Sequence, residues 1–227
     1  MPAYLSSALF TAVLAGSSVA PTSAPADASV APATTQASSL TLASLLDRMG
    51  AMQGLSATFR EEKHMSLLAV PLVNEGTVHF ARGVGLVRHT QAPAASTVLI
   101  RGDQLSVGAG GDRRDIDLGQ NPVVRLFVDS IVKIYAGDRL ALERMYTMQF
   151  LPGEGQQWSL RLVPKLAPMD GIIAKVELRG EGLVLATMEI VERSGDVTVT
   201  TFSEVQVDRA FAPADIERLF QMPEQAS

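Results

Sequence analysis

The sequence of 227 residues contains no cysteine. Disulfide bonds, thiol catalysis and zinc sites built from thiolates are therefore excluded. The three histidines, His64, His79 and His89, form neither an HxxxH nor an HExxH pair, the spacings that bring two imidazoles to one metal ion. We expect no bound metal and no cofactor.

Basic charge and aromatic residues are also scarce. The net charge is -5 and only 5% of the residues are aromatic. Proteins that bind nucleic acid present a basic surface that displaces counterions, so we expect no nucleic-acid partner. The same charge disfavours non-specific adhesion to an anionic membrane.

Signatures of catalysis are missing as well. The glycine-rich turn at Gly108 to Asp112 is not followed by the GK[ST] of a P-loop, and no G-x-S-x-G elbow occurs. Asp129 and Asp138 are too weakly defined as a pair for acid/base work. We expect that the protein is not an enzyme. The alternative, a hydrolase of lipid esters, would need a nucleophile with a recognisable base beside it.

The amino terminus has the layout of an export signal. Tyr4 to Gly16 are mostly apolar or small, and the small-x-small triplets Ser18-Val19-Ala20 and Ala26-Asp27-Ala28 follow. The apolar run is too short to span a bilayer. The basic start that is usual for an export signal is absent, since no Lys or Arg precedes Arg48. We predict a signal peptide over 1–28 and a disordered linker over 29–38, rich in Ala, Pro, Ser and Thr. The alternative is a disordered cytoplasmic tail.

The remaining chain predicts a few helices and about ten strands. Apolar residues at helical spacing predict a helix over Ser39 to Met52. Asn121-Pro122 is a good helix start, with Asn as the cap, and Gly137 would end that helix after about Tyr135. A short helix is expected over Arg139 to Met145 and a last helical turn over Asp215 to Phe220. The expected strands are Leu55 to Leu68, Gly76 to Ala81, Gly85 to Thr90, Thr97 to Arg101, Gln104 to Val107, Thr147 to Leu151, Trp158 to Val163, Ile172 to Arg179, Leu183 to Glu192 and Val197 to Val207.

These strands are consecutive and have short connections, which is typical of an antiparallel meander. A wide antiparallel sheet curls, and its concave face has to be covered. We therefore expect a mainly β (α+β) fold with a curved antiparallel sheet and amphipathic helices in its concavity. If the helices do not fill the concavity, an apolar gap remains beneath them.

Several motifs together resemble the LolA family of periplasmic outer-membrane lipoprotein carriers, in the right order over most of residues 40–220. The motifs are Phe59-Arg60-Glu61 for the family's F-x-Q, Glu75 to Arg82 for G-x-l-x-f-x-R, Gly85 to Arg88 with Pro93, Val98 to Leu105 for l-l-x-D-G-x-x-l, Asn121-Pro122 for T-P, Leu162 to Lys165 for L-x-P-K, and Phe202 to Phe220 for the closing strand. Three positions depart from the family: its proline after the arginine is Gly83, its next-strand tryptophan is Arg88, and the Gln of F-x-Q is Glu61. The central helical segment is also longer.

The resemblance implies a LolA-like domain over 39–222, with a tail at 223–227. Its sheet would form an incomplete β-barrel, and the helices would be a lid over an apolar cavity. The implied cavity wall is Phe59, Phe80, Leu86, Val98, Ile100, Phe127 and Ile131, each of which has ordinary core as its alternative. Arg82 matches the family arginine that latches the lid helix, with an ordinary surface arginine as the alternative.

The implied function is that of a monomeric periplasmic carrier. It would bind lipid or lipoprotein acyl chains, receive them from an inner-membrane donor complex and pass them to an outer-membrane acceptor. The departures suggest a glycolipid or polyene-type lipid as a further possible cargo. The alternative is an envelope lipid-binding sensor or adaptor that does not transport.

Two other groups of residues were considered from the sequence. Met145, Met148, Met169 and Met188 are candidates for a pliable cavity lining or for gap-filling core. The charged cluster Asp112 to Asp117 reads as a solvated loop, with a docking surface as its alternative.

Overall fold

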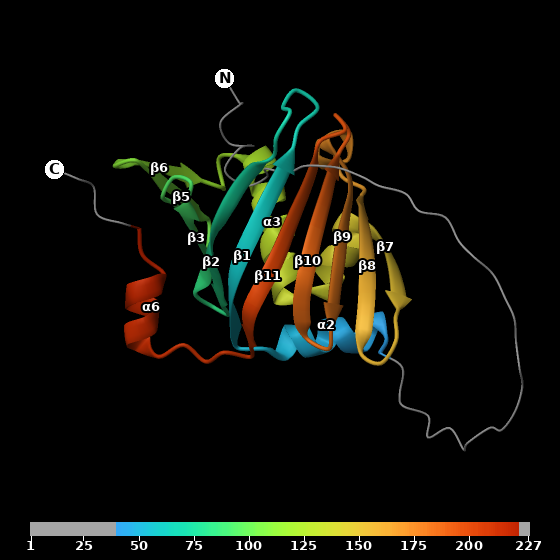
Figure 1. The fold of residues 1–227 in the computed structure, drawn as a ribbon. Helices are drawn as coiled ribbons and strands as arrows, with labels where there is room; N and C mark the ends of the chain where they lie inside the picture. The colour runs from blue at the N-terminus through green and yellow to red at the C-terminus, as the bar shows by residue number, and fades with distance from the viewer. Residues whose placement is uncertain (1–39, 223–227) are drawn as a thin grey trace, which may run out of the picture.

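A single antiparallel sheet dominates the structure, a computed structural model that describes residues 40–222. Its eleven strands lie in the order β6-β5-β4-β3-β2-β1-β11-β10-β9-β8-β7. The sheet curls but does not close, so β6 and β7 are its edges (Figure 1). The predicted signal peptide (1–28), linker (29–38) and tail (223–227) lie outside the described residues.

The strands follow one another as a meander, except that β11 closes against β1. Their bounds are β1 Gly54–His64, β2 Leu72–Ala81, β3 Gly85–Ala92, β4 Ser96–Arg101, β5 Gln104–Ala109, β6 Asp112–Asp117, β7 Tyr146–Pro152, β8 Gln157–Pro164, β9 Ile173–Glu181, β10 Val184–Glu192 and β11 Val197–Val207. The described helices are α2 Leu42–Ala51, α3 Pro122–Ala136, α4 Arg139–Met145, α5 Met169–Ile172 and α6 Pro213–Leu219.

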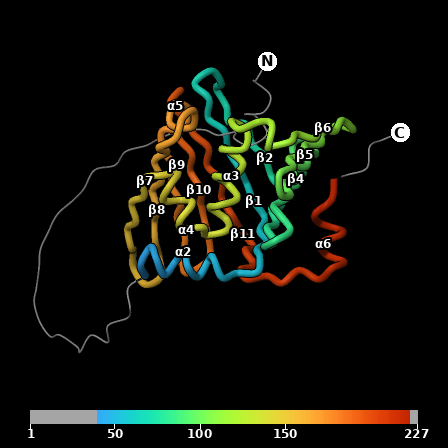
Figure 2. The backbone as a smooth tube through the Cα atoms, turned by 180° about the vertical axis from the view of Figure 1, so that it is seen from behind, coloured from blue at the N-terminus to red at the C-terminus, as the bar shows by residue number. Residues whose placement is uncertain are grey.

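Helices α2, α3 and α4 cover the concave face of the sheet, and we call them the lid (Figures 1 and 2). Side chains of all three belong to one hydrophobic cluster with the inward-facing side chains of the strands. Thr41 starts α2 with a capping box, in which its side chain accepts from the Ser44 N–H. The buried Leu45, Leu46 and Met49 then form one face of that helix.

Gly137 lies where helices α2 and α3 of the lid approach each other. It ends α3 with φ of 61°, a conformation that glycine adopts without strain. A Cβ at Gly137 would also lie 2.5 Å from the Met49 Cβ and 2.8 Å from the Gly50 nitrogen of α2. The close approach of α2 and α3 therefore depends on glycine at this position.

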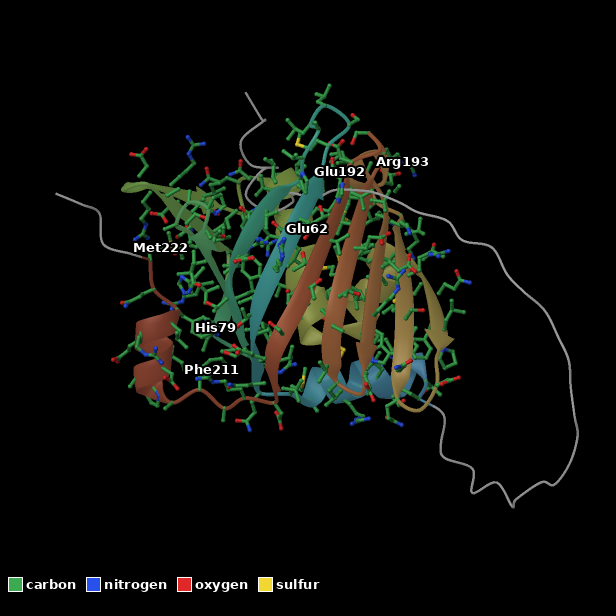
Figure 3. All side chains as sticks on the ribbon, viewed as in Figure 1. Glu62, His79, Glu192, Arg193, Phe211 and Met222 are labelled. Carbon is green, nitrogen blue, oxygen red and sulfur yellow. The ribbon has the colours of Figure 1, made fainter. Side chains whose placement is uncertain are left out.

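The convex face carries a second, smaller cluster under α6. Phe220, Ala81, Val87 and Leu99 are buried there. Figure 3 shows His79 and Phe211 on this side of the molecule, beside α6. The last segment of the chain thus seals the outside of β2 to β4 rather than the concavity.

Some sequence expectations were wrong in detail. The charged segment Asp112–Asp117 is not a solvated loop but edge strand β6, paired with β5 along its whole length. Asn121 does not cap α3 with its side chain, whose amide nitrogen instead donates to the Asp117 carbonyl at 2.7 Å. Strand β1 ends at His64 rather than Leu68, β2 begins at Leu72, and the short helix α5 was not expected. The curved sheet and the covering helices are confirmed.

Candidate functional site

The structure brings the seven predicted wall residues together on the concave side. Phe80 of β2 pairs with Leu86 of β3, which pairs with Ile100 of β4, so these three form a row across the sheet. Phe59 and Val98 lie on the same face, and all five are at most 4% exposed. Phe127 and Ile131 of α3 pack against the same cluster and are half-buried.

In the closed state described by the structure, these side chains pack against one another and the lid. Three clefts, of about 750, 450 and 340 Å³, lie elsewhere and are lined by other residues. The four methionines proposed as lining also join the main cluster: Met145, Met169 and Met188 are buried, and Met148 packs against them. These side chains form an apolar interior between the sheet and the lid.

The lid is unevenly anchored. Residues 122–127 of α3 include no buried side chain, although Val123, Val124, Leu126 and Phe127 are apolar, and Val123 is 51% exposed. The second half of the helix contains its buried residues, among them Ile134 and Tyr135. The first half of α3 is therefore less deeply buried than the second half.

Arg82 ties this lid to the sheet. Its Nε donates to the Met52 carbonyl at 2.8 Å, and its Nη2 donates to the carbonyls of Met49 and Ala136, both at 3.2 Å. One guanidinium at the end of β2 thus holds the carboxyl-terminal ends of both α2 and α3. A planar, permanently charged group with five donors suits this task. The geometry is the one a latch requires.

Sequence reasoning missed a buried ion pair on the concave face. Glu61 of β1 and Arg88 of β3 contact each other through two bonds, of 2.7 and 2.8 Å. Both positions depart from the LolA-like pattern, and the departures have opposite charge. Glu61 shares a strand face with Phe59, and Arg88 shares one with Leu86, so alternation along the two strands was the signal that could have linked them.

The apolar loop between β1 and β2 is another feature that the sequence did not single out. Leu67 is 87% exposed, Val70 70%, Leu68 42% and Leu72 41%. The Ser66 N–H donates to Asp196 in the turn between β10 and β11 at 3.3 Å. Figure 3 places Glu192 and Arg193 of that turn at the same end of the molecule. Exposed apolar side chains gathered in one loop are typical of an interaction surface.

A Ser–His contact lies on the opposite, convex side. The Oγ of Ser56 is 2.5 Å from Nδ1 of His79 and accepts from Arg209 at 3.0 Å. Burial, reinforced by His89 and Arg209, lowers the pKa of His79 to about 4, so this imidazole is a weak base. Both side chains are buried. The contact is that of a structural hydrogen bond, not of an activated nucleophile.

Within residues 40–222 no three histidine or acidic side chains are grouped so that they could hold a metal ion. None of the helices described there has the length and apolar character needed to cross a bilayer.

Three solved structures are among those that resemble this chain. No curated protein matches the chain. A LolA superfamily protein from Nitrosomonas europaea is 15% identical, with 78% of this chain and 97% of that chain covered and a TM-score of 0.41. MucB in the Pseudomonas aeruginosa MucA/MucB complex is 14% identical, with 77% and 60% covered and a TM-score of 0.47. LprF from Mycobacterium bovis is 12% identical, with 82% and 95% covered and a TM-score of 0.38.

A family model matches a larger part of the chain than these structures do. The model described as "Outer membrane lipoprotein carrier protein LolA-like" matches residues 33–221, which is nearly the whole of the described structure and confirms the resemblance. The chain therefore belongs to the LolA-like family of outer membrane lipoprotein carrier proteins.

Proposed function

We propose that the protein is a periplasmic carrier that binds the acyl chains of lipids or lipoproteins between its sheet and its lid. The observation that supports this most is the Arg82 latch over an apolar concave face. The three hydrogen bonds of Arg82 can break while the hydrogen bonds between the strands stay intact. An open lid would expose the apolar side chains of β1 to β4 to a hydrocarbon tail, which is excluded from water for the same reason as they are.

The route proposed for the cargo is from an inner-membrane donor complex to an outer-membrane acceptor. The export layout of residues 1–28 and the family to which the chain belongs support a periplasmic location. The exposed apolar loop between β1 and β2 would contact the donor, the acceptor or the membrane itself. Leu67 and Val70 would account for most of the apolar surface that this contact buries.

The test is lipid retention followed by lipid transfer. Protein isolated gently from its native host should carry a lipid that mass spectrometry detects after extraction. The purified chain should then move a fluorescent acyl probe from donor vesicles to acceptor vesicles. If the protein neither retains nor takes up any acyl ligand, the proposal is wrong. Binding without transfer would instead identify the sensor or adaptor.

A further inference from the structure

The Glu61–Arg88 pair is unusual because it is a charged group inside the apolar concavity. Glu61 is 2% exposed. Its two oxygens also accept from Asn74 at 3.2 Å and from Thr200 at 3.4 Å. The Arg88 guanidinium lies over the ring of Phe59, 4.0 Å from its centroid. The carboxylate is thus fully occupied by donors of this chain.

Arg88, by contrast, retains an unused donor. Its Nε is buried and has no hydrogen-bond partner within the described residues. The Oγ1 of Thr198 is in the same condition. Thr198 lies on β11, which pairs with β1 and places Thr198 opposite Lys63 and Thr200 opposite Glu61. A buried donor without an acceptor costs about 1–3 kcal/mol, and buried polar groups are otherwise almost always satisfied.

Stability does not explain this arrangement. A buried ion pair can generally be replaced by apolar side chains without loss of stability, because desolvation of the two charges offsets their attraction. An orphaned donor adds to that cost. A buried donor without an acceptor, inside a surface that otherwise suits hydrocarbon, is a place where a ligand would supply the missing acceptor.

The pair also lies where a ligand would be bound. Arg88 is paired in register with Val98 and contacts Phe59, two of the predicted wall residues. On the lid side, Tyr135 of α3 is close enough for Glu61 and Arg88 to influence its pKa, which burial raises. The unused donor is therefore between the sheet and the lid, among the apolar side chains of the proposed cavity.

We propose that Arg88, held by Glu61, is a polar subsite whose Nε–H donates a hydrogen bond to the carbonyl oxygen of a neutral linkage, an ester or amide, in an acyl-chain cargo. This inference rests on the proposed carrier function and specifies its substrate class. The linkage must be neutral because Glu61 already compensates the guanidinium. The neighbouring Lys63 is likewise paired with Glu192, at 3.4 Å. A carboxylate or phosphate would bring an uncompensated charge into a dry site, which is unfavourable.

Binding of three probes with the same chain length tests this proposal. Hexadecane, methyl palmitate and palmitate would each displace the neutral fluorophore 1-aminoanthracene from the full chain at pH 7.5. We expect methyl palmitate to bind about ten-fold or more tightly than hexadecane, the ratio expected for one hydrogen bond from a charged donor. In the double variant Arg88→Met/Glu61→Gln, this preference should vanish.

A single variant tests the charge balance separately. Glu61→Gln leaves the Arg88 charge uncompensated, so palmitate should gain at least about ten-fold relative to methyl palmitate. The matched control is Arg60→Met/Glu75→Gln, which removes another Arg–Glu pair of β1 and β2, 3.7 Å apart and largely exposed on the convex face. It should leave all three affinities unchanged.

The outcomes distinguish failure of the proposed subsite from failure of the proposed carrier function. Equal affinity of the wild-type protein for methyl palmitate and hexadecane would overturn the subsite and leave the carrier intact. No binding of any probe would overturn both. If the double variant no longer unfolds cooperatively, Glu61→Gln decides alone, and an unchanged palmitate affinity there would overturn the subsite.

Discussion

At the scale of single residues, the contacts of Arg82 differ from those usual at its position. Arg82 lies at a strand end, where an arginine is usually a solvated charge. Here its guanidinium is satisfied by three carbonyls of the lid. The sequence motif predicted the latch only through family resemblance, because the acceptors are backbone atoms of α2 and α3 that no side-chain pattern reveals.

The latch leads to a prediction for Arg82→Leu. Loss of the three hydrogen bonds should lower the free energy of unfolding by only about 1–2 kcal/mol, since Arg82 is exposed to solvent. Probe transfer between vesicles should fall several-fold, while the equilibrium affinity for the probe should change less than about two-fold. Denaturant titration and a vesicle transfer assay would measure the two effects.

The control for this prediction is Arg60→Leu. Arg60 lies outward on β1 and forms only exposed ion pairs, with Glu62 and Glu75. Its loss should affect neither transfer nor affinity. Undiminished transfer by the Arg82→Leu variant would refute the latch and leave the binding site itself unaffected.

The lowered pKa of His79 predicts that the free energy of unfolding changes with pH. Its pKa of about 4 in the folded protein is below the usual value of 6.5, so the unfolded chain binds the proton first as the pH falls. Stability from this group is therefore fully present above pH 6.5 and is lost progressively between about pH 6.5 and 4. The full effect is about 3 kcal/mol.

The measurement is the free energy of unfolding of wild type and His79→Asn from pH 7.5 to pH 4.5. His89, Arg209, Arg218 and Asp215 face His79 and are retained in the variant. His64, whose pKa burial also lowers to about 4, adds a similar slope to both proteins. The variant should show the smaller slope, and equal slopes would exclude His79 as the titrating group.

At the scale of elements, the edge strand β6 shows what pattern alone misses. Its sequence DRRDID has no run of alternating apolar residues, which is why it resembled a loop. It becomes a strand because β5 offers a full ladder of backbone partners. Its charged side chains suit an edge, where they discourage pairing with another chain. The charged side chains that made this segment resemble a loop therefore also explain why the strand lies at the edge of the sheet.

We predict that helix α6 can separate from β2 to β4 without unfolding the rest of the protein. Phe220 is 1% exposed and packs against Phe211, with ring centroids 5.3 Å apart. Two side chains of the sheet also bind the carboxyl-terminal end of α6. Arg101 donates to the Phe220 carbonyl at 2.6 Å, and His89 donates to the Leu219 carbonyl at 2.8 Å. Phe220→Ala should cost about 3–5 kcal/mol and release α6 from β2 to β4.

Hydrogen exchange would follow that release. Amides of 213–222 should lose protection in the Phe220→Ala variant, while those of β8 to β10 keep theirs. The matched control is Leu140→Ala, since Leu140 is 62% exposed and its truncation should change stability by less than about 0.5 kcal/mol. Loss of protection throughout the sheet would show instead that α6 is part of the main cooperative unit.

At the scale of the whole molecule, the two faces of the sheet have different tasks. The concave face, under the lid, contains the candidate wall, the latch and the Glu61–Arg88 pair. The convex face is closed by α6 over a small core of its own. The apolar β1–β2 loop projects from the end at which β10 and β11 turn (Figure 1).

The double variant Leu67→Ser/Val70→Ser tests that loop. Both side chains are largely exposed, so stability should stay within about 0.5 kcal/mol of wild type. Probe affinity should also be unchanged, but transfer to acceptor vesicles should slow several-fold because the contact surface is lost. Leu151→Ser, which changes a half-exposed leucine on β7, is the control. An unaltered transfer rate would assign the loop no part in delivery.

By itself the sequence determined most of the succession of helices and strands, the meander and the absence of thiol chemistry. These depend on periodicity, turn residues and composition, which are local properties of the chain. Only the tertiary structure decided which carbonyls Arg82 reaches, that Glu61 and Arg88 meet, that 112–117 is a strand and that α6 covers the outer face. Each of these depends on partners distant in sequence, whose approach follows from the curl and register of the sheet.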